Sequence, residues 1–134
     1  MKFPPTAQPS VPVSWGELID KVTILEIKSE KLQNTDALAN VRHELDLLQT
    51  FVAPIVAETG EIGDLKSQLK AINTRLWDIE DRIREKEAAT TFDAEFIELA
   101  RSVYKTNDER SALKKRINAQ LRSAIVEEKS YSRY

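Results

Sequence analysis

The amino-acid sequence predicts an all-α protein folded as an antiparallel up-down-up-down four-helix bundle, preceded by an extended Pro-rich N-terminal arm. Apolar residues recur at alternating steps of three and four in successive segments, which is the spacing of one helix face. The 134 residues include only 3 Gly and 5 Pro, and four of the prolines precede Val13. Short connections between the segments make neighbouring helices antiparallel. We therefore divide the chain into the arm (residues 1–13), the bundle (14–126) and a polar tail (127–134).

Composition and charge exclude several classes of function. The net charge of -2 gives no general attraction to nucleic acid or to an anionic membrane surface. The chain has no cysteine for disulfides or thiolate metal sites, and His43 is its only histidine, whereas a di-iron bundle needs paired Glu-x-x-His motifs. No apolar run approaches the ~18 residues of a membrane-spanning helix. We expect a cytoplasmic protein with no cofactor, no metal and no membrane partner.

The first helix is expected to begin after Ser14 and to end near Gln33. Ser14 and Glu17 have the spacing of a capping box, in which each side chain accepts a hydrogen bond from the backbone N–H of the other residue. The core-facing stripe follows at helical spacing and consists of Trp15, Leu18, Val22, Leu25 and Leu32. Ile24 and Ile27 project from roughly the opposite, outer side of this helix, beside Asp20 and Lys31.

The second helix is expected to begin with Thr35 or Asp36 as its cap. Its apolar seam alternates steps of three and four, as in a coiled coil, and consists of Leu38, Val41, Leu45, Leu48, Val52 and Ile55. Leu47 and Phe51 lie off this seam, on the far side. Pro54 removes a backbone donor and is expected to kink or stop the helix.

The third helix is expected to follow a loop marked by Gly60 and Gly63. Asp64 is its predicted cap, and its last turn ends in the charged run near Glu87. The seam has the same alternation and consists of Leu65, Leu69, Ile72, Leu76, Ile79 and Ile83. Trp77 sits to one side of the seam.

The fourth helix is expected to span residues 92–125, with Thr91 or Asp93 as its cap. Its stripe consists of Phe96, Leu99, Val103, Leu113, Ile117 and Leu121. Polar residues interrupt the middle of this stripe, namely Thr106, Asn107 and Arg110. A second capping box formed by Thr106 and Glu109 would break the helix at Asn107, but we expect one continuous helix.

The polar interruption is the best clue to a site, because a charged side chain in an apolar stripe must be paired, be solvated or bind a ligand. Counting back from each connection places Arg110 near the level of Asn73. We expect Arg110 to pair with Glu26 or Glu44 across the bundle. Asn73 and Asn107 would complete the hydrogen bonds. The alternatives are a polar layer that fixes helix register, an arginine lifted into solvent, and a site for an anionic ligand.

Four blocks of the sequence resemble the signatures of a family of small bacterial proteins of unknown function. In order, these blocks are SWGELIDKVTILEIK (14–28), LWDIED (76–81), TNDER (106–110) and EEKSY (127–131). The resemblance covers most of the chain from Val11 onward. It implies a helical, cytosolic protein with no established activity, and it assigns no catalytic residues.

Several apolar residues lie off the seams and cannot all face one core, namely Ile24, Ile27, Leu47, Phe51 and Trp77. Such second patches on helices often mark protein interfaces. We therefore expect a homo-oligomer with closed symmetry. The predicted function is that of a non-catalytic, self-assembling helical protein with a scaffolding or binding role.

Two other functions stay open at this point. Small helical enzymes such as chorismate mutases bind a dicarboxylate between helices with arginine and lysine and need no metal. Arg110, Lys114, Arg75 and Glu26 could form such a site, although the spacing of that family is not reproduced. The second alternative is nucleic-acid binding near Tyr104, because basic residues cluster at Lys105, Arg110, Lys114, Lys115, Arg116 and Arg122. The ordinary interpretation of that cluster is a solvated face with ion pairs between neighbouring turns.

Overall fold

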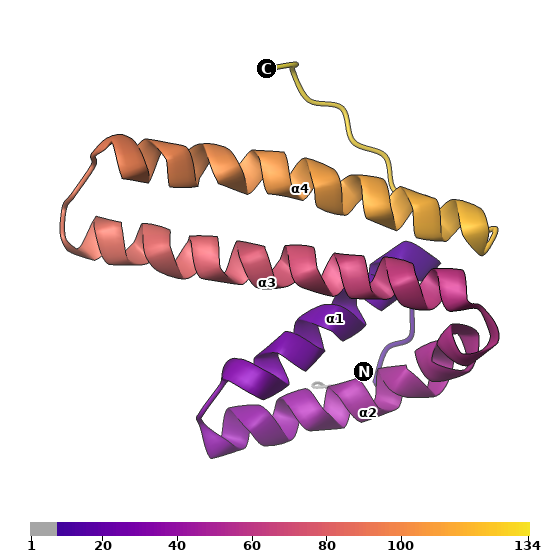
Figure 1. Cartoon of the computed structure of the whole chain (residues 1–134). Helices are drawn as coiled ribbons and strands as arrows, with labels where there is room; N and C mark the ends of the chain where they lie inside the picture. Colours follow the sequence, from indigo (N-terminus) through magenta and orange to yellow (C-terminus); the bar gives the residue numbers. More distant parts are fainter. Residues whose placement is uncertain (1–7) are drawn as a thin grey trace, which may run out of the picture.

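Four helices make up the computed structural model of the chain, which describes residues 8–134 (Figure 1). They are α1 (Trp15–Lys31), α2 (Thr35–Glu58), α3 (Gly60–Ala88) and α4 (Ala94–Gln120). Residues 8–134 contain no strand, so the predicted all-α class is confirmed for this part of the chain. Of the predicted arm, residues 1–7 lie outside the described residues, and residues 8–13 form neither helix nor strand.

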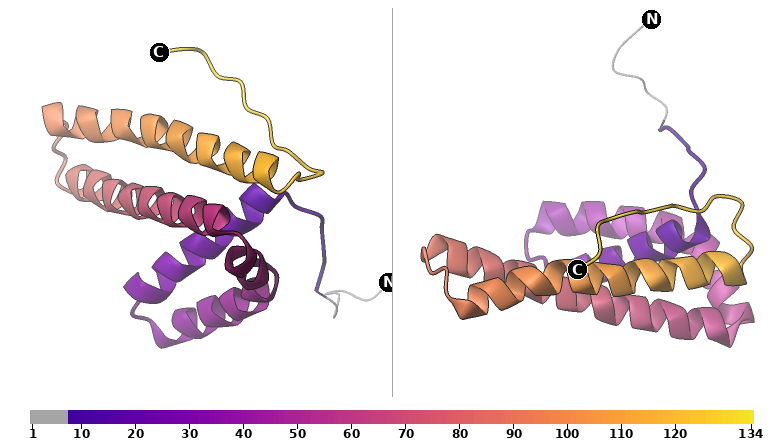
Figure 2. Two further views of the ribbon diagram at one scale, coloured as in Figure 1. Left: turned by 45° about the vertical axis from the view of Figure 1, so that its right-hand side comes forward. Right: turned by 90° about the horizontal axis from the view of Figure 1, so that it is seen from above.

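The helices form two hairpins that cross obliquely, as Figures 1 and 2 show. α3 and α4 lie side by side along their length, whereas α1 and α2 form the shorter hairpin. α1 packs against all three other helices, and α2 does not contact α4. Lys31 Nζ lies 3.7 Å from Asp78 Oδ1, which places the end of α1 beside the middle of α3. The α3–α4 hairpin therefore extends beyond the end of α1.

The hydrophobic core receives side chains from all four helices and consists of Ile19, Val22, Val52, Ile62, Leu65, Leu69, Ile72, Leu113 and Ile117. Full burial of one such side chain stabilises a fold by roughly 1.5–3 kcal/mol. This cluster fixes the α1–α2 hairpin against the α3–α4 hairpin. Across residues 8–134, no helix combines the length and the apolar character that crossing a membrane requires.

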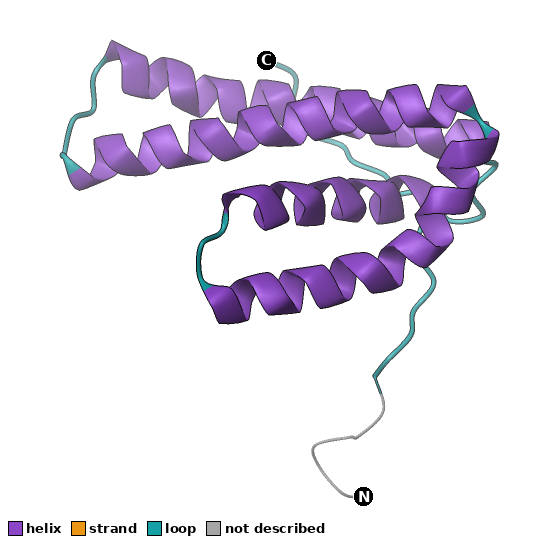
Figure 3. Cartoon of the chain, turned by 60° about the horizontal axis from the view of Figure 1, so that its bottom comes forward, coloured by secondary structure: helices purple, strands orange, loops and turns teal. Residues whose placement is uncertain are grey.

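The predicted boundary between the second and third helices is wrong. The stop expected at Pro54 is wrong, whereas the alternative, a kink, agrees with the structure: α2 continues through Pro54 to Glu58, and Figure 3 shows it bending toward α3 in its last turns. Pro54 is exposed, so the carbonyl group that loses its helical hydrogen bond can bond to water. α3 begins at Gly60 and not at Asp64. Ile62 is fully buried in this first turn, and its burial outweighs the helix-propensity cost of the glycines, about 1 kcal/mol each.

The fourth helix is continuous through Asn107, as expected, but it ends at Gln120 and not near Ile125. Arg122 has a φ of 51°, which turns the chain out of the helix. The backbone N–H of Ser123 then donates to the carbonyl oxygen of Asn118 at 2.8 Å. Such a bond to a carbonyl group of the last turn is a common way to end a helix.

Side chains cap three of the four helices. Those of Ser14 and Asp93 accept hydrogen bonds from the backbone N–H three residues further on, at 3.0 Å in both cases, and both were expected as caps. The cap of α2 is Asn34, whose Oδ1 accepts a backbone N–H at 2.9 Å. The prediction of Thr35 or Asp36 is therefore wrong by one or two residues, because the helix already includes both.

α1 is buried on two sides, whereas the sequence predicted one buried apolar side and an opposite side facing outward. Ile27 and Asp20, both expected on the outer side, are each 1% exposed. The physical reason is that α1 lies between α2 and the α3–α4 hairpin, so both of its sides meet another helix. Ile27 therefore cannot belong to a surface patch, and its assignment to an oligomer interface is wrong.

Candidate functional site

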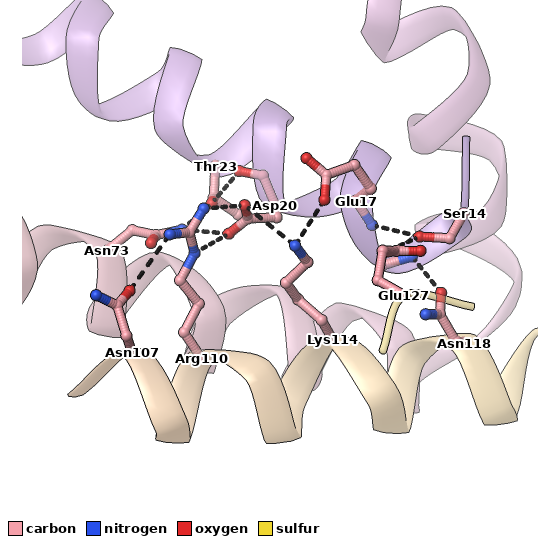
Figure 4. Close-up of polar contacts among 11 residues, drawn as sticks. Ser14, Glu17, Asp20, Thr23, Asn73, Asn107, Arg110, Lys114, Asn118 and Glu127 are labelled. Atoms are coloured by element: carbon pink, nitrogen blue, oxygen red, sulfur yellow. Dashed lines mark hydrogen bonds and ion pairs between the residues drawn. The ribbon is translucent and has the colours of Figure 1, made fainter. Parts of the chain in front are cut away.

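A buried carboxylate, Asp20 of α1, lies at the centre of the candidate site (Figure 4). The guanidinium group of Arg110 on α4 binds it with two hydrogen bonds. Arg110 Nε donates to Oδ1 at 2.9 Å, and Nη2 donates to Oδ2. These hydrogen bonds to Asp20 raise the pKa of Arg110, so the arginine stays charged. This two-point geometry is the arrangement in which an arginine binds a carboxylate most strongly.

Neutral side chains complete the hydrogen bonds around this pair. Asn73 Nδ2 on α3 donates to Asp20 Oδ1 at 2.8 Å and to Thr23 Oγ1 at 2.9 Å. Thr23 Oγ1 in turn donates to the carbonyl oxygen of Asp20 at 2.7 Å. Asn107 Oδ1 accepts a longer hydrogen bond, of 3.4 Å, from Arg110 Nη1. The site thus joins α1, α3 and α4 through a polar network with partners for its buried groups, which is the condition for such groups to be tolerated.

A second cation stands beside this network. Lys114 Nζ, one turn after Arg110, lies 2.6 Å from Glu17 Oε2 and 4.0 Å from Asp20 Oδ2. The carboxylate of Glu17 therefore pairs with α4 and does not complete the capping box expected at the start of α1. Only one of the two capping hydrogen bonds forms, from the backbone N–H of Glu17 to Ser14 Oγ. The positive charges of Arg110 and Lys114 equal the negative charges of Asp20 and Glu17. The four groups therefore have no net charge that would attract an external ion.

The start of α1 docks on the end of α4 through a close backbone approach. The N–H of Gly16 donates to Asn118 Oδ1 at 2.6 Å. A Cβ atom at Gly16 would lie 2.6 Å from the carbonyl oxygen of Lys114, so only glycine fits there. Ser14 Oγ also donates to Glu127 Oε1 at 2.6 Å, which ties the tail to the same point. The first N–H groups of α1 are therefore bonded within the chain and do not form an anion site.

The expected partners of Arg110 are wrong. Glu26 lies 2.9 Å from Lys66 Nζ, and Glu44 lies 2.9 Å from Lys21 Nζ. The structure brings Arg110, Asn73 and Asn107 together, but around Asp20, a residue expected on the outer side of the first helix. A usable signal was present: Asp20 shares its side of α1 with Ile24 and Ile27, and a side that carries two isoleucines is a candidate for burial.

The residues proposed for an enzyme of the chorismate-mutase kind do not form one site. Arg75 pairs with Glu109 at 3.0 Å on the exposed surface, and Glu26 pairs with Lys66. Arg110 and Lys114 pair with the carboxylates of α1. Within residues 8–134, no group of three or more His, Asp or Glu side chains is placed to hold a metal ion.

The residues expected at an oligomer interface fall into three groups. Leu47 and Phe51 are 55% and 57% exposed on α2. Ile24 and Trp77 are half-buried. Ile27 is buried, as described above. Only the pair on α2 therefore forms an open apolar surface among these five residues.

Three of the four sequence blocks that resemble a known family meet in this site. The first block supplies Ser14, Gly16, Glu17 and Asp20, the third supplies Asn107 and Arg110, and the fourth supplies Glu127. No curated protein and no solved structure matches the chain. Residues 10–134 match the model of a family of unknown function, DUF6165. Because this match covers nearly the whole chain, the protein belongs to that family.

Proposed function

We propose that this protein is a non-catalytic helical protein that self-associates through the outer face of α2 and acts as a scaffold or binding platform. The observation that carries this proposal is the exposure of Leu47 and Phe51 in the single chain, 55% and 57%. The two residues are four apart, so their side chains are neighbours on one helix face. Large apolar side chains that lie together on a surface mark interaction sites more often than isolated ones do.

A second copy of the chain is the partner that this face fits. Asn40, His43, Glu44 and Pro54 flank the pair on this face. Of these only Glu44 is charged, and its carboxylate is already paired with Lys21 Nζ at 2.9 Å. An antiparallel pairing of two α2 helices about a two-fold axis would place Leu47 of one copy against Phe51 of the other, twice. Such a self-complementary surface is what a two-fold dimer requires. α2 contacts α1 and α3 but not α4, and the exposure of Leu47 and Phe51 shows that this part of its surface is uncovered.

The lack of a catalytic role is also part of the proposal. It is supported by the candidate site, in which Asp20, Arg110 and Lys114 have partners within the chain and none is left to act on a substrate. A polar layer that fixes how α1 sits on α3 and α4 explains this arrangement. We also propose, from the sequence, the antiparallel up-down-up-down order of the bundle, its Pro-rich arm and a cytoplasmic location.

Light scattering coupled to size-exclusion chromatography tests the self-association. We expect a mass of about twice the 15.3 kDa of one chain at micromolar concentration. The double variant Leu47→Glu/Phe51→Glu should run as a monomer, because two carboxylates would be buried in the dimer. The matched control is Ile97→Glu, since Ile97 on α4 is 56% exposed and lies outside the proposed face. A wild-type mass of 15.3 kDa, or an unchanged mass in the double variant, would refute the proposal.

A further inference from the structure

The chain after α4, residues 123–134, forms a strap that borders an open groove along that helix. Figures 1 and 2 show the tail after α4 turning back over that helix, with the C-terminus standing off from it. One end of the strap is held by Ser14 Oγ, which donates to Glu127 at 2.6 Å. At the other end, the hydroxyl of Tyr134 donates to Asp108 Oδ2 at 2.6 Å, and its ring lies 5.1 Å from that of Tyr104. The groove between strap and helix has a volume of about 1070 Å³.

The charged side chains that line this groove are mostly basic. Lys115 of α4 and Lys129 and Arg133 of the strap contribute three cations, whereas Asp108 is the single acidic side chain of the lining. None of these three cations takes part in an ion pair within residues 8–134. The side chains of the groove therefore leave an excess of two positive charges, in contrast to the balanced charges around Asp20. An anion is the ligand that such an excess attracts.

Aromatic rings line the same groove. Tyr104 comes from α4, and Tyr131 and Tyr134 come from the strap. Tyr131 and Tyr134 are 77% and 76% exposed, so much of their surface is free for contact. The hydrogen bond to Asp108 raises the pKa of Tyr134, which favours the protonated hydroxyl that donates this bond. Rings combined with cations are the elements that bind a flat ring and a phosphate group together.

We propose that this groove binds an organic phosphate that carries a flat ring, which is the chemistry of a mononucleotide. The cations would hold the phosphate oxygens, and a tyrosine ring would stack on the flat part of the ligand. The volume is close to the upper end of the range for small-molecule sites, roughly 300–1,000 Å³. A small ligand fits better than a nucleic-acid strand, because a strand would have to thread beneath a strap that is held at both ends. This site is separate from the α2 face, so the two proposals can fail independently.

Isothermal titration calorimetry with the full chain tests this inference, with adenosine 5′-diphosphate, adenosine and inorganic phosphate as the probes. We expect the diphosphate to bind with a Kd below about 1 mM and each of the other two probes to bind at least about tenfold more weakly. Lys115→Glu and Arg133→Glu should each weaken diphosphate binding by about tenfold or more, because each reverses a charge of the lining. The control is Arg42→Glu on α2, an exposed arginine that lies outside the groove.

Four results would overturn the inference. The first is no binding of the diphosphate at millimolar concentration. The second is equal binding of adenosine or phosphate, which would remove the role of the cations or of the rings. The third is an equal loss of binding in the Arg42→Glu control, which would point to a general charge effect. The fourth is tighter binding of a single-stranded oligonucleotide than of the diphosphate, which would make a polymer the ligand.

Discussion

α1 and α2 form one hairpin, yet their surroundings differ greatly. In α1 seven of 17 residues are buried, whereas in α2 only two of 24 are. α1 packs against three helices and buries a carboxylate, Asp20, and a hydroxyl group, Thr23. The buried residues of α2 are both valines, Val41 and Val52, and its far side carries two large exposed side chains.

This difference suggests that the two helices of the hairpin have different roles. A buried carboxylate is tolerated only where its partners stand at fixed positions, so Asp20 favours one placement of α1 against α3 and α4. An apolar contact does not fix position in this way, because many side chains of similar size can pack against each other. α2 therefore needs little specific geometry on its outer side, and that side is free to contact another molecule. We infer that the inner helix specifies the fold and that the outer helix supplies the interaction surface.

The largest effect is expected when the buried carboxylate of the inner helix loses its cation. Arg110→Met should lower the free energy of unfolding by about 3–5 kcal/mol, because the side chain of Asp20, only 2% exposed, would lose its main partner. Arg75→Met is the matched control. Arg75 pairs with Glu109 with both side chains 56% exposed, so its loss should cost less than about 1 kcal/mol. Urea denaturation followed by circular dichroism measures both values.

Equal losses in the two arginine variants would contradict the special role of the α1–α4 pair. A gain in stability on Arg110→Met, with an unchanged oligomeric state, would show that the network around Asp20 neither stabilises nor specifies the fold.

The second expected effect compares apolar residues of the inner and outer helices directly. Ile27→Ala should lower the free energy of unfolding by about 2–5 kcal/mol, since Ile27 is 1% exposed and its truncation leaves a cavity. Leu47→Ala should change it by no more than about 0.5 kcal/mol in the dissociated chain, because Leu47 is 55% exposed. Thermal or urea unfolding at a protein concentration low enough to prevent association gives both values. Similar losses of stability in the two variants would mean that the outer face of α2 is not exposed in the single chain.

The same comparison explains how far the sequence could predict the fold. The alternation of three and four in Leu65, Leu69 and Ile72 predicts a helix, because local spacing is sufficient to define one apolar face. The boundary at Pro54 and Gly60 could not be predicted from local residues, because the burial of Ile62 outweighs the local preference of proline and glycine to end a helix. Local helix propensity gives the wrong helix boundary where the burial of a side chain in the tertiary structure contributes more free energy than the propensity does.

The candidate site was predictable in part for a related reason. Arg110 and Asn107 interrupt a regular stripe, so their position alone indicates a polar site. Their partner Asp20 lies on a helix that is buried on two sides, so an acidic residue opposite the apolar stripe need not face solvent. The identity of the partner depends on how two hairpins cross, and that crossing is not contained in the periodicity of any one helix.

The smallest effect of the series comes from glycine positions and tests how tightly α1 is held. Gly16→Ala should lower the free energy of unfolding by about 1–3 kcal/mol, because the new Cβ would lie 2.6 Å from the carbonyl oxygen of Lys114 and 2.9 Å from Asn118 Oδ1. The same substitution at Gly60 has no atom within 4 Å of the new Cβ and should raise stability by up to about 1 kcal/mol. The pair shares one chemical change, so the difference in urea midpoint reports the contact between α1 and α4 alone. If Gly16→Ala were neutral, the start of α1 would be free to move away from α4, and the inner helix would be less constrained than its buried polar network requires.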